Sequence, residues 1–289
     1  MLKVKKSMQI NVFWTKILRR IEPARELNLN QVIGKDITIK KNMDIISFSA
    51  LAFLGEFFIF FSSIEFATII YIIDLWLIIF LAYRSNKRIY PALIFIPLLR
   101  ILNISVPIFF TQTLYSYWLV YAVMIIPIYI VLRNKKFNPK ELGFNFEKLD
   151  YYIPFGIFIG LILGGIEYQI LHPESLLQSF GIREIIILSV IMIFFVGFVE
   201  EFIFRSMIQI VLENRLGAVK GILATSILFG IMSSGYGLIT EILFSTLVGL
   251  IFGFLFKKTR SLMLVMIAHG FTNITLFMII PLLLSSLTR

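Results

Sequence analysis

The chain contains no cysteine among its 289 residues. Disulfide bonds, thiolate metal sites and cysteine nucleophiles are therefore excluded. Charged residues are also scarce, at 15% of the chain, whereas soluble domains contain about a quarter. The two histidines offer few ligands for a zinc site, so we expect no metal and no cofactor.

Apolar side chains, in contrast, are abundant. Hydrophobic residues make up 58% of the sequence, and the mean hydropathy is +0.91. A soluble core of this size could not bury so many Ile, Leu and Phe side chains. We therefore expect an integral membrane protein whose surrounding solvent is the lipid bilayer.

The apolar residues fall into runs long enough to cross a bilayer, which takes about 20 helical residues. The runs are 45–63, 66–83, 89–110, 114–132, 151–171, 184–211, 221–235, 238–256 and 261–285. The first two could be one bent hairpin, and the seventh is short. The sequence therefore predicts an all-α, polytopic transmembrane helix bundle of about eight or nine spans. No internal repeat is evident, which argues against an inverted-repeat transporter.

The basic residues lie between these runs. The formal net charge of +10 could indicate a nucleic-acid partner, but the Lys and Arg residues alternate with the runs as the positive-inside rule predicts. A nine-span chain with a cytoplasmic N-terminus puts every basic connection on one side of the membrane. We therefore expect a multi-pass protein of the cell membrane that does not bind nucleic acid. The sequence does not indicate an oligomeric state.

Composition divides the chain into four parts. They are a basic cytoplasmic segment over 1–43, a four-helix membrane part over 44–133, a cytoplasmic loop over 134–150 and a membrane core over 151–289. Within the first part, residues 10–18 fit either an amphipathic surface helix or a solvated tail. The frequent Ile and Lys residues suit an AT-rich prokaryotic genome.

Ionisable side chains inside the apolar runs carry the functional signal, because a charge in hydrocarbon marks a function or a paired contact. Asp74 and Arg100 could neutralise each other, and a structural ion pair is the preferred interpretation. Glu56, Glu167 and Glu241 lie nearer to the ends of their runs, where solvated or snorkelling side chains are common.

Glu200, Glu201 and Arg205 lie within the long run over 184–211. Glu201 and Arg205 are four residues apart, so they share one helix face and can pair. Glu200 is rotated from Glu201 by about 100° and points elsewhere. A carboxylate in that position is a candidate general base. The alternative is an acidic pair that only docks onto other helices.

His269 and Asn273 share one face of the last run. Together they can donate hydrogen bonds to an oxyanion, or they can form a polar contact between helices. Counted from the cytoplasmic ends, Glu200 lies about 16 Å deep, His269 about 13 Å and Asn273 about 19 Å, at about 1.5 Å per helical residue. These groups fall within one layer of the membrane and could surround one cavity.

The order Glu200-Glu201-x-x-x-Arg205, then a Phe-containing helix, then His269-x-x-x-Asn273 resembles the CAAX protease and bacteriocin-processing family. This family is also called the Abi or CAAX prenyl protease 2 family. The resemblance covers roughly residues 151–285, and the N-terminal part carries no motif. It implies an all-α intramembrane protease of the glutamate type, with a prenylated or membrane-associated peptide as substrate.

The resemblance also implies roles for single residues. Glu200 would be the base that activates water, and Glu201 with Arg205 would be the supporting pair. His269 and Asn273 would form the oxyanion hole. In the family, a histidine of the middle motif shares the activation of water with the first glutamate.

The middle motif of this chain differs from the family pattern Phe-x-x-x-His. The sequence reads Phe229-Gly-Ile-Met-Ser233, which leaves Phe229 as a packing residue and Ser233 as the degenerate catalytic position. The other histidine of the chain, His172, is expected at the outer end of the fifth run. That is the wrong side of the membrane for it to replace the missing histidine of the middle motif. Loss of one water-activating group could lower the rate by about 10²–10⁴.

Three functions remain open. The first is an endopeptidase in which a water activated by Glu200 hydrolyses a peptide bond of a lipidated or membrane-embedded substrate. The second is a catalytically impaired relative that acts as a binding or bacteriocin-immunity protein. The third is a proton-coupled transporter, for which a Glu-rich cavity with an arginine would be suitable.

Overall fold

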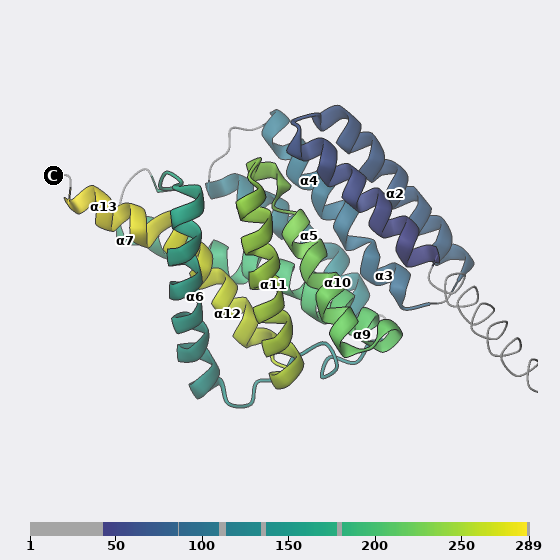
Figure 1. Ribbon diagram of the computed structural model, residues 1–289. Helices are drawn as coiled ribbons and strands as arrows, with labels where there is room; N and C mark the ends of the chain where they lie inside the picture. The colour runs from purple at the N-terminus through teal and green to yellow at the C-terminus, as the bar shows by residue number, and fades with distance from the viewer. Residues whose placement is uncertain (1–42, 86, 110–113, 134–136, 178–180, 288–289) are drawn as a thin grey trace, which may run out of the picture. The chain divides into compact units, whose positions relative to one another are not determined.

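The structure is a computed structural model that describes residues 43–85, 87–109, 114–133, 137–177 and 181–287. Every regular element in these ranges is helical (Figure 1). The first helix covers Met43–Phe60. The others are α2 (Ile64–Arg84), α3 (Ile89–Leu93), α4 (Phe95–Phe109), α5 (Leu114–Arg133), α6 (Leu149–Leu171), α7 (Ile182–Val190), η1 (Ile191–Gly197), α8 (Phe198–Glu201), η2 (Phe202–Gln209), α9 (Ile210–Leu216), α10 (Ala218–Ile231), η3 (Ser234–Tyr236), α11 (Ile239–Thr259), α12 (Leu262–Ile274), η4 (Thr275–Ile279) and α13 (Ile280–Leu287).

The chain divides into two compact units, Met1–Phe48 and Ser49–Arg289. The second unit contains every predicted site residue. The structure describes the first unit only from residue 43. The predicted surface helix over 10–18, and the basic segment around it up to residue 42, lie outside the described residues.

Nine helical stretches within the described residues are long and apolar enough to cross a membrane. They are Met43–Phe60, Ile64–Arg84, Ile89–Val106, Leu114–Arg133, Leu149–Leu171, Ile182–Leu216, Ala218–Tyr236, Ile239–Thr259 and Leu262–Leu287. The predicted all-α polytopic bundle is therefore confirmed, and the protein is a multi-pass membrane protein. The first two runs are separate helices, joined by a turn in which Ser62 has a positive φ of 59°.

The sixth span is the longest, with 35 residues. Within it, α7, η1, α8, η2 and α9 follow one another without a break, and η1 and η2 are π-helical. At about 1.5 Å per residue this span is about 50 Å long, which exceeds the hydrocarbon thickness of about 30 Å. It must therefore tilt in the bilayer or extend beyond the hydrocarbon layer.

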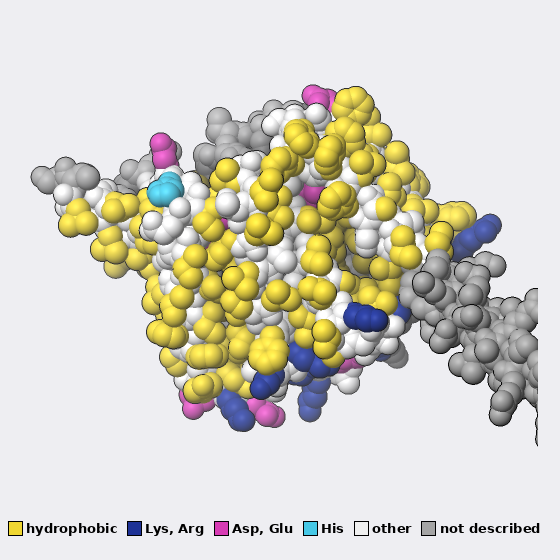
Figure 2. Space-filling view, in the orientation of Figure 1, with side chains coloured by type: hydrophobic (Ala, Val, Ile, Leu, Met, Phe, Trp, Pro, Cys, Tyr) yellow, Lys and Arg dark blue, Asp and Glu magenta, His cyan; other side chains and the backbone are white. Residues whose placement is uncertain are grey.

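Apolar side chains cover most of the face shown in Figure 2, as lipid contact requires. Trp76, Phe80 and Leu247 are among the large apolar side chains that are more than half exposed. On this face, Lys and Arg side chains gather at the edge where α6 begins and α11 ends. Lys257 and Lys258 belong to that last turn of α11.

Helix α6 packs against α12 through glycines spaced by four residues. Cβ atoms built at Gly160 and Gly164 would lie 2.5 Å from Ala268 O and 2.4 Å from Thr272 O, respectively. Any larger residue would therefore push the two backbones apart. Small residues at such positions are the usual means of bringing membrane helices together, because lipid provides no hydrophobic drive for their association.

The predicted ion pair between Asp74 and Arg100 is wrong. Arg100 pairs with Glu56 instead, and its Nε donates to Glu56 Oε1 at 2.5 Å. Tyr71 of α2 also donates to Glu56, which is 3% exposed and is therefore not a solvated or snorkelling side chain. The carboxylate oxygens of Asp74 are buried and have no hydrogen-bond partner among the described residues.

The partner choice has a simple physical reason. Glu56 of helix Met43–Phe60 and Arg100 of α4 are both buried, and their charges meet away from lipid. The rotation of a helix about its axis decides which acid faces the arginine, and hydropathy contains no information about that rotation.

The glycine contact between α6 and α12 is testable. We expect Gly160→Leu to lower the stability of the protein by about 1–3 kcal/mol or more, because an overpacked side chain must displace backbone. Gly165→Leu is the matched control, since a Cβ atom at Gly165 has nothing within 4 Å. Thermal unfolding midpoints in detergent would measure both. Equal midpoints for the two variants would contradict this account of the packing.

Candidate functional site

A cavity of about 720 Å³ lies among the spans of the second unit. Its lining includes Glu200, Phe229, Ser233, His269 and Asn273, which the sequence selected as one site. They come from α8, α10, the turn that follows α10, and α12. The structure thus brings these five to one cavity, whereas the other two predicted residues, Glu201 and Arg205, do not line it. His172 caps the C-terminal end of α6 and is not part of the lining.

Glu201 lies behind this cavity and binds two partners at once. Its Oε2 accepts a hydrogen bond from Arg205 Nε at 2.8 Å, and its Oε1 lies 2.7 Å from His269 Nδ1. The side chains of Glu201 and Arg205 are fully buried. The expected pair four residues apart is present, and it also reaches α12, which the sequence did not predict.

Arg205 is held by an aromatic ring as well as by the carboxylate. Its guanidinium carbon lies 5.1 Å from the centroid of the Phe229 ring, a distance suited to a cation–π contact. Its two terminal nitrogens are buried without a hydrogen-bond partner among the described residues. The Phe229 ring also meets the His269 ring edge to face at 5.9 Å. Phe229 therefore packs between the arginine and the histidine.

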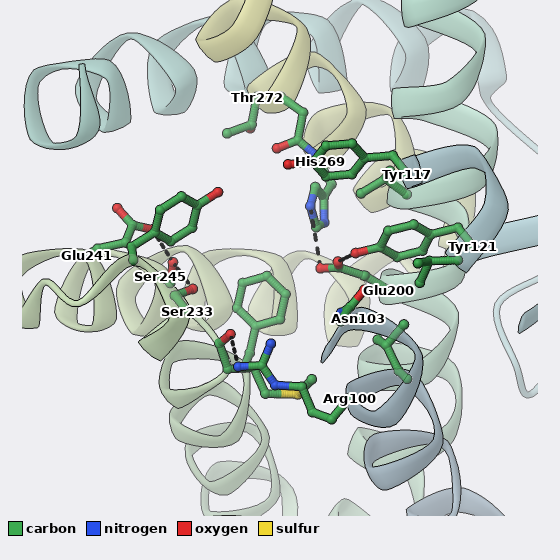
Figure 3. Close-up of a pocket in the computed structure, with 18 of the residues that line it drawn as sticks. Arg100, Asn103, Tyr117, Tyr121, Glu200, Ser233, Glu241, Ser245, His269 and Thr272 are labelled. Atoms are coloured by element: carbon green, nitrogen blue, oxygen red, sulfur yellow. Dashed lines mark hydrogen bonds and ion pairs between the residues drawn. The ribbon is translucent and has the colours of Figure 1, made fainter. Parts of the chain in front are cut away.

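Glu200 points away from Glu201, as the helical rotation predicts, and enters the cavity. Its side chain is 20% exposed, and its Oε2 lies 3.8 Å from His269 Nε2. The hydroxyl of Tyr121 on α5 donates to its Oε1. Figure 3 shows Glu200 between Tyr121 and His269, with its carboxylate facing both side chains.

The contact with Glu201 determines what His269 can do. An ionised carboxylate only accepts hydrogen bonds, so Nδ1 must carry the proton that it donates to Glu201. The other nitrogen, Nε2, faces Glu200 and the cavity. It can donate to an oxyanion only when the ring carries both protons, and the neutral ring presents a lone pair there instead.

Ser233 is engaged with two other residues. Its hydroxyl donates to Ser245 Oγ at 2.8 Å, and the Ser245 hydroxyl donates to Glu241 Oε1 at 2.7 Å. Glu241 and Glu167 were expected near span ends, and both line the cavity. Glu241 is only 1% exposed, and its Oε2 has no hydrogen-bond partner in the described part of the chain.

The sequence did not indicate that Tyr121, Ser245 or the pair of Arg100 with Glu56 would lie beside the site. Tyr121 has no detectable sequence signal, because one tyrosine among eleven on an apolar helix carries no pattern. Ser245 follows Glu241 by four residues and so shares its helix face, which is a usable signal. Among the described residues, no group of three or more His, Asp or Glu side chains is placed to hold a metal ion.

Fold and geometry together describe a polytopic membrane protein with a buried Glu–Arg–His cluster beside a polar cavity. Residues 182–275 match the family model of the type II CAAX prenyl endopeptidases, Rce1-like. The match confirms the resemblance to the CAAX protease and bacteriocin-processing family over the segment from Glu200 to Asn273. No curated protein and no solved structure matches the chain. The roles of the single residues, and Ser233 as the replacement for a histidine, stay predictions.

The buried pair of Glu201 with Arg205 generates a prediction on stability. We expect Glu201→Gln to destabilise the protein by about 3–5 kcal/mol, because it leaves the arginine charge buried without its partner. Glu141→Gln is the control, since Glu141 pairs with Arg88 at a surface where both side chains are about a third exposed or more. That change should alter stability by about 1 kcal/mol or less. Thermal unfolding in detergent compares them, and similar shifts would refute a special role for the buried pair.

Proposed function

We propose that this protein is an intramembrane endopeptidase of the CAAX prenyl protease type. The observation that carries the proposal is the pair of Glu200 and His269, which face each other at 3.8 Å on the cavity wall. Behind them, Glu201 holds the imidazole and Arg205 holds Glu201. This arrangement supplies a carboxylate and an oriented imidazole at a place where a water and a peptide bond can meet.

The reaction needs a base, an oxyanion site and a proton donor for the leaving amine. Glu200 takes a proton from a cavity water, whose oxygen attacks the carbonyl carbon of the substrate. His269, protonated on both nitrogens, donates from Nε2 to the developing oxyanion, and the Asn273 amide donates the second hydrogen bond. Glu200 then passes its proton to the nitrogen as the C–N bond breaks.

The location of the cavity limits the substrate. Because the lining comes from membrane-spanning helices, a peptide must bring its scissile bond into the bundle. A lipidated or membrane-embedded peptide is already concentrated at the membrane and meets this requirement. We propose the cell membrane as the location and the cytoplasm as the side of the N-terminus, on the basis of the charge pattern.

A second candidate function is a non-catalytic binding or immunity protein with the same fold. It is favoured by one observation, which is that a serine follows Phe229 at the spacing of the middle motif. The Ser233 hydroxyl is hydrogen-bonded to Ser245, and a hydroxyl cannot share a proton with Glu200 as an imidazole would.

Glu200→Gln is the decisive variant. We expect purified protein in lipid nanodiscs to cleave a farnesylated peptide or a transmembrane peptide, and we expect Glu200→Gln to lower kcat by about 10²-fold or more. Mass spectrometry of the products would identify the cleaved bond. Glu147→Gln makes the same chemical change at an exposed position before α6 and should keep wild-type activity.

Two results would reject the proposal in favour of another function. One is equal turnover by wild-type protein and Glu200→Gln. The other is no turnover by wild-type protein together with cleavage by Ser233→His, which would identify a catalytically impaired relative.

A further inference from the structure

Ser233 lies two residues after the last residue of α10, Ile231, and lines the cavity. Its hydroxyl starts a chain of two hydrogen bonds that leads through Ser245 to Glu241 on α11. Figure 3 shows this chain, and Ser233 is the member that lies toward Glu200 and His269 in that view. The chain thus ends in the cavity that contains the candidate base.

The polarity of the chain follows from the protons that its members own. A hydroxyl has one proton to donate and two lone pairs that accept. Ser245 gives its proton to Glu241, so it accepts from Ser233, and Ser233 has no proton left for the cavity. Toward the cavity, Ser233 Oγ is therefore an acceptor alone. Hydrogen bonds in series polarise one another, so the carboxyl group at the far end strengthens this acceptor.

Close packing of α10 on α11 holds the serine chain together. A Cβ atom at Gly230 would lie 1.9 Å from Thr246 Oγ1 and 2.7 Å from Ile242 O, so this approach requires glycine. The backbone N–H of Ser233 donates to Gly230 O at 3.0 Å, which fixes the serine relative to that contact.

The other side of the same turn is held by the buried ion pair. Arg100 Nη2 donates to Met232 O at 2.8 Å, and the Ser234 hydroxyl donates to Glu56. The residues before and after Ser233 are thus both tied to the pair of Arg100 with Glu56. Ser233 therefore has a defined position, which an acceptor for a reacting water needs.

We propose that Ser233 holds the hydrolytic water of the proposed reaction and that Ser245 and Glu241 act through Ser233 as positioning residues. The inference rests on the proposed function. A water has two protons, of which Glu200 accepts one and Ser233 Oγ the other. With both protons held in this way, a lone pair of the water oxygen can point at the substrate carbonyl carbon. The serine chain supplies the acceptor for which the family pattern uses a histidine.

No proton moves along the serine chain in this mechanism. The water oxygen bonds to the carbonyl carbon while one proton passes to Glu200, and that proton goes to the leaving nitrogen when the C–N bond breaks. The second proton stays on the new carboxyl oxygen, which donates a hydrogen bond to Ser233 Oγ throughout. The peptide bond and one water are consumed, and one carboxyl group and one amine are formed.

Ser245→Ala breaks the chain and leaves Ser233, the proposed ligand of the water, in place. With Ser245 gone as an acceptor, the Ser233 proton can turn into the cavity and donate to the water, which is the wrong polarity. We expect kcat on the farnesylated peptide to fall about tenfold, with KM within about twofold and an unchanged thermal midpoint. Ser245→Thr keeps the hydroxyl and should restore kcat. Glu241→Gln should lower kcat similarly, because its amide can donate to Ser245 and reverse the chain.

Ser226→Ala is the matched control for Ser245→Ala. Ser226 is a buried serine of α10 whose hydroxyl donates to Ile222 O of its own helix at 2.7 Å, and it does not line the cavity. Its removal should leave kcat at the wild-type value. A fall in kcat as large as that of Ser245→Ala would show that any buried serine has this effect, which would overturn the inference.

The outcomes separate this inference from the function on which it rests. Activity that requires Glu200 but is indifferent to Ser245→Ala and Glu241→Gln would overturn the water-holding role and leave the endopeptidase standing. Equal activity of wild-type protein and Glu200→Gln would remove the endopeptidase itself. A wild-type protein that gains activity only through Ser233→His would show that the serine chain does not replace an imidazole, which also overturns the inference.

Discussion

The site depends on the double contact of the Glu201 carboxylate with Arg205 and His269. A buried charge is costly in a membrane unless it has a partner, and the Glu201 carboxylate is the partner of both Arg205 and His269. One oxygen binds a guanidinium of its own helix, and the other binds an imidazole of α12. The second contact sets the orientation of the imidazole ring, and it thereby places Nε2 opposite Glu200. The carboxylate that forms the buried ion pair with Arg205 therefore also orients His269 toward Glu200.

That contact forms because the two helices approach each other at backbone distance. A Cβ atom at Gly197 would lie 2.7 Å from Met266 O, and one at Gly270 would lie 2.7 Å from Ile193 Cα. Glu200 follows Gly197 by less than one turn. The short helix α8 with both glutamates lies between the π-helical segments η1 and η2. Such wide turns are frequent at functional sites, because they shift the side chains that follow relative to a regular helix.

Features that depend on neighbouring residues in the chain could be read from the sequence. The spans follow from apolar length, and the pair of Glu201 with Arg205 follows from one helical turn. Partners from distant helices could not be read in this way, because they depend on how each helix is rotated about its axis. Asp74 and Glu56 were equally available to Arg100 by composition, and only the packed structure shows that Glu56 faces it. The contact of His269 with Glu201 belongs to the same class, although the resemblance had placed both residues in one site.

Contacts between distant helices also explain how the N-terminal helices contribute to a site whose motifs lie in the C-terminal part of the chain. The segment that matches the family model begins at residue 182, yet the hydroxyl bound to Glu200 comes from Tyr121 on α5. The carbonyl beside Ser233 is bound by Arg100 on α4. The motif segment therefore supplies the acidic and imidazole groups, while the helices before it fix the groups that touch them. Charged groups in a membrane must face the interior of a helix bundle or a water-filled cavity, so neighbouring helices have to shield them from lipid. The helices without motifs are thus part of the site, because they shield from lipid the charges that would be costly in a bilayer.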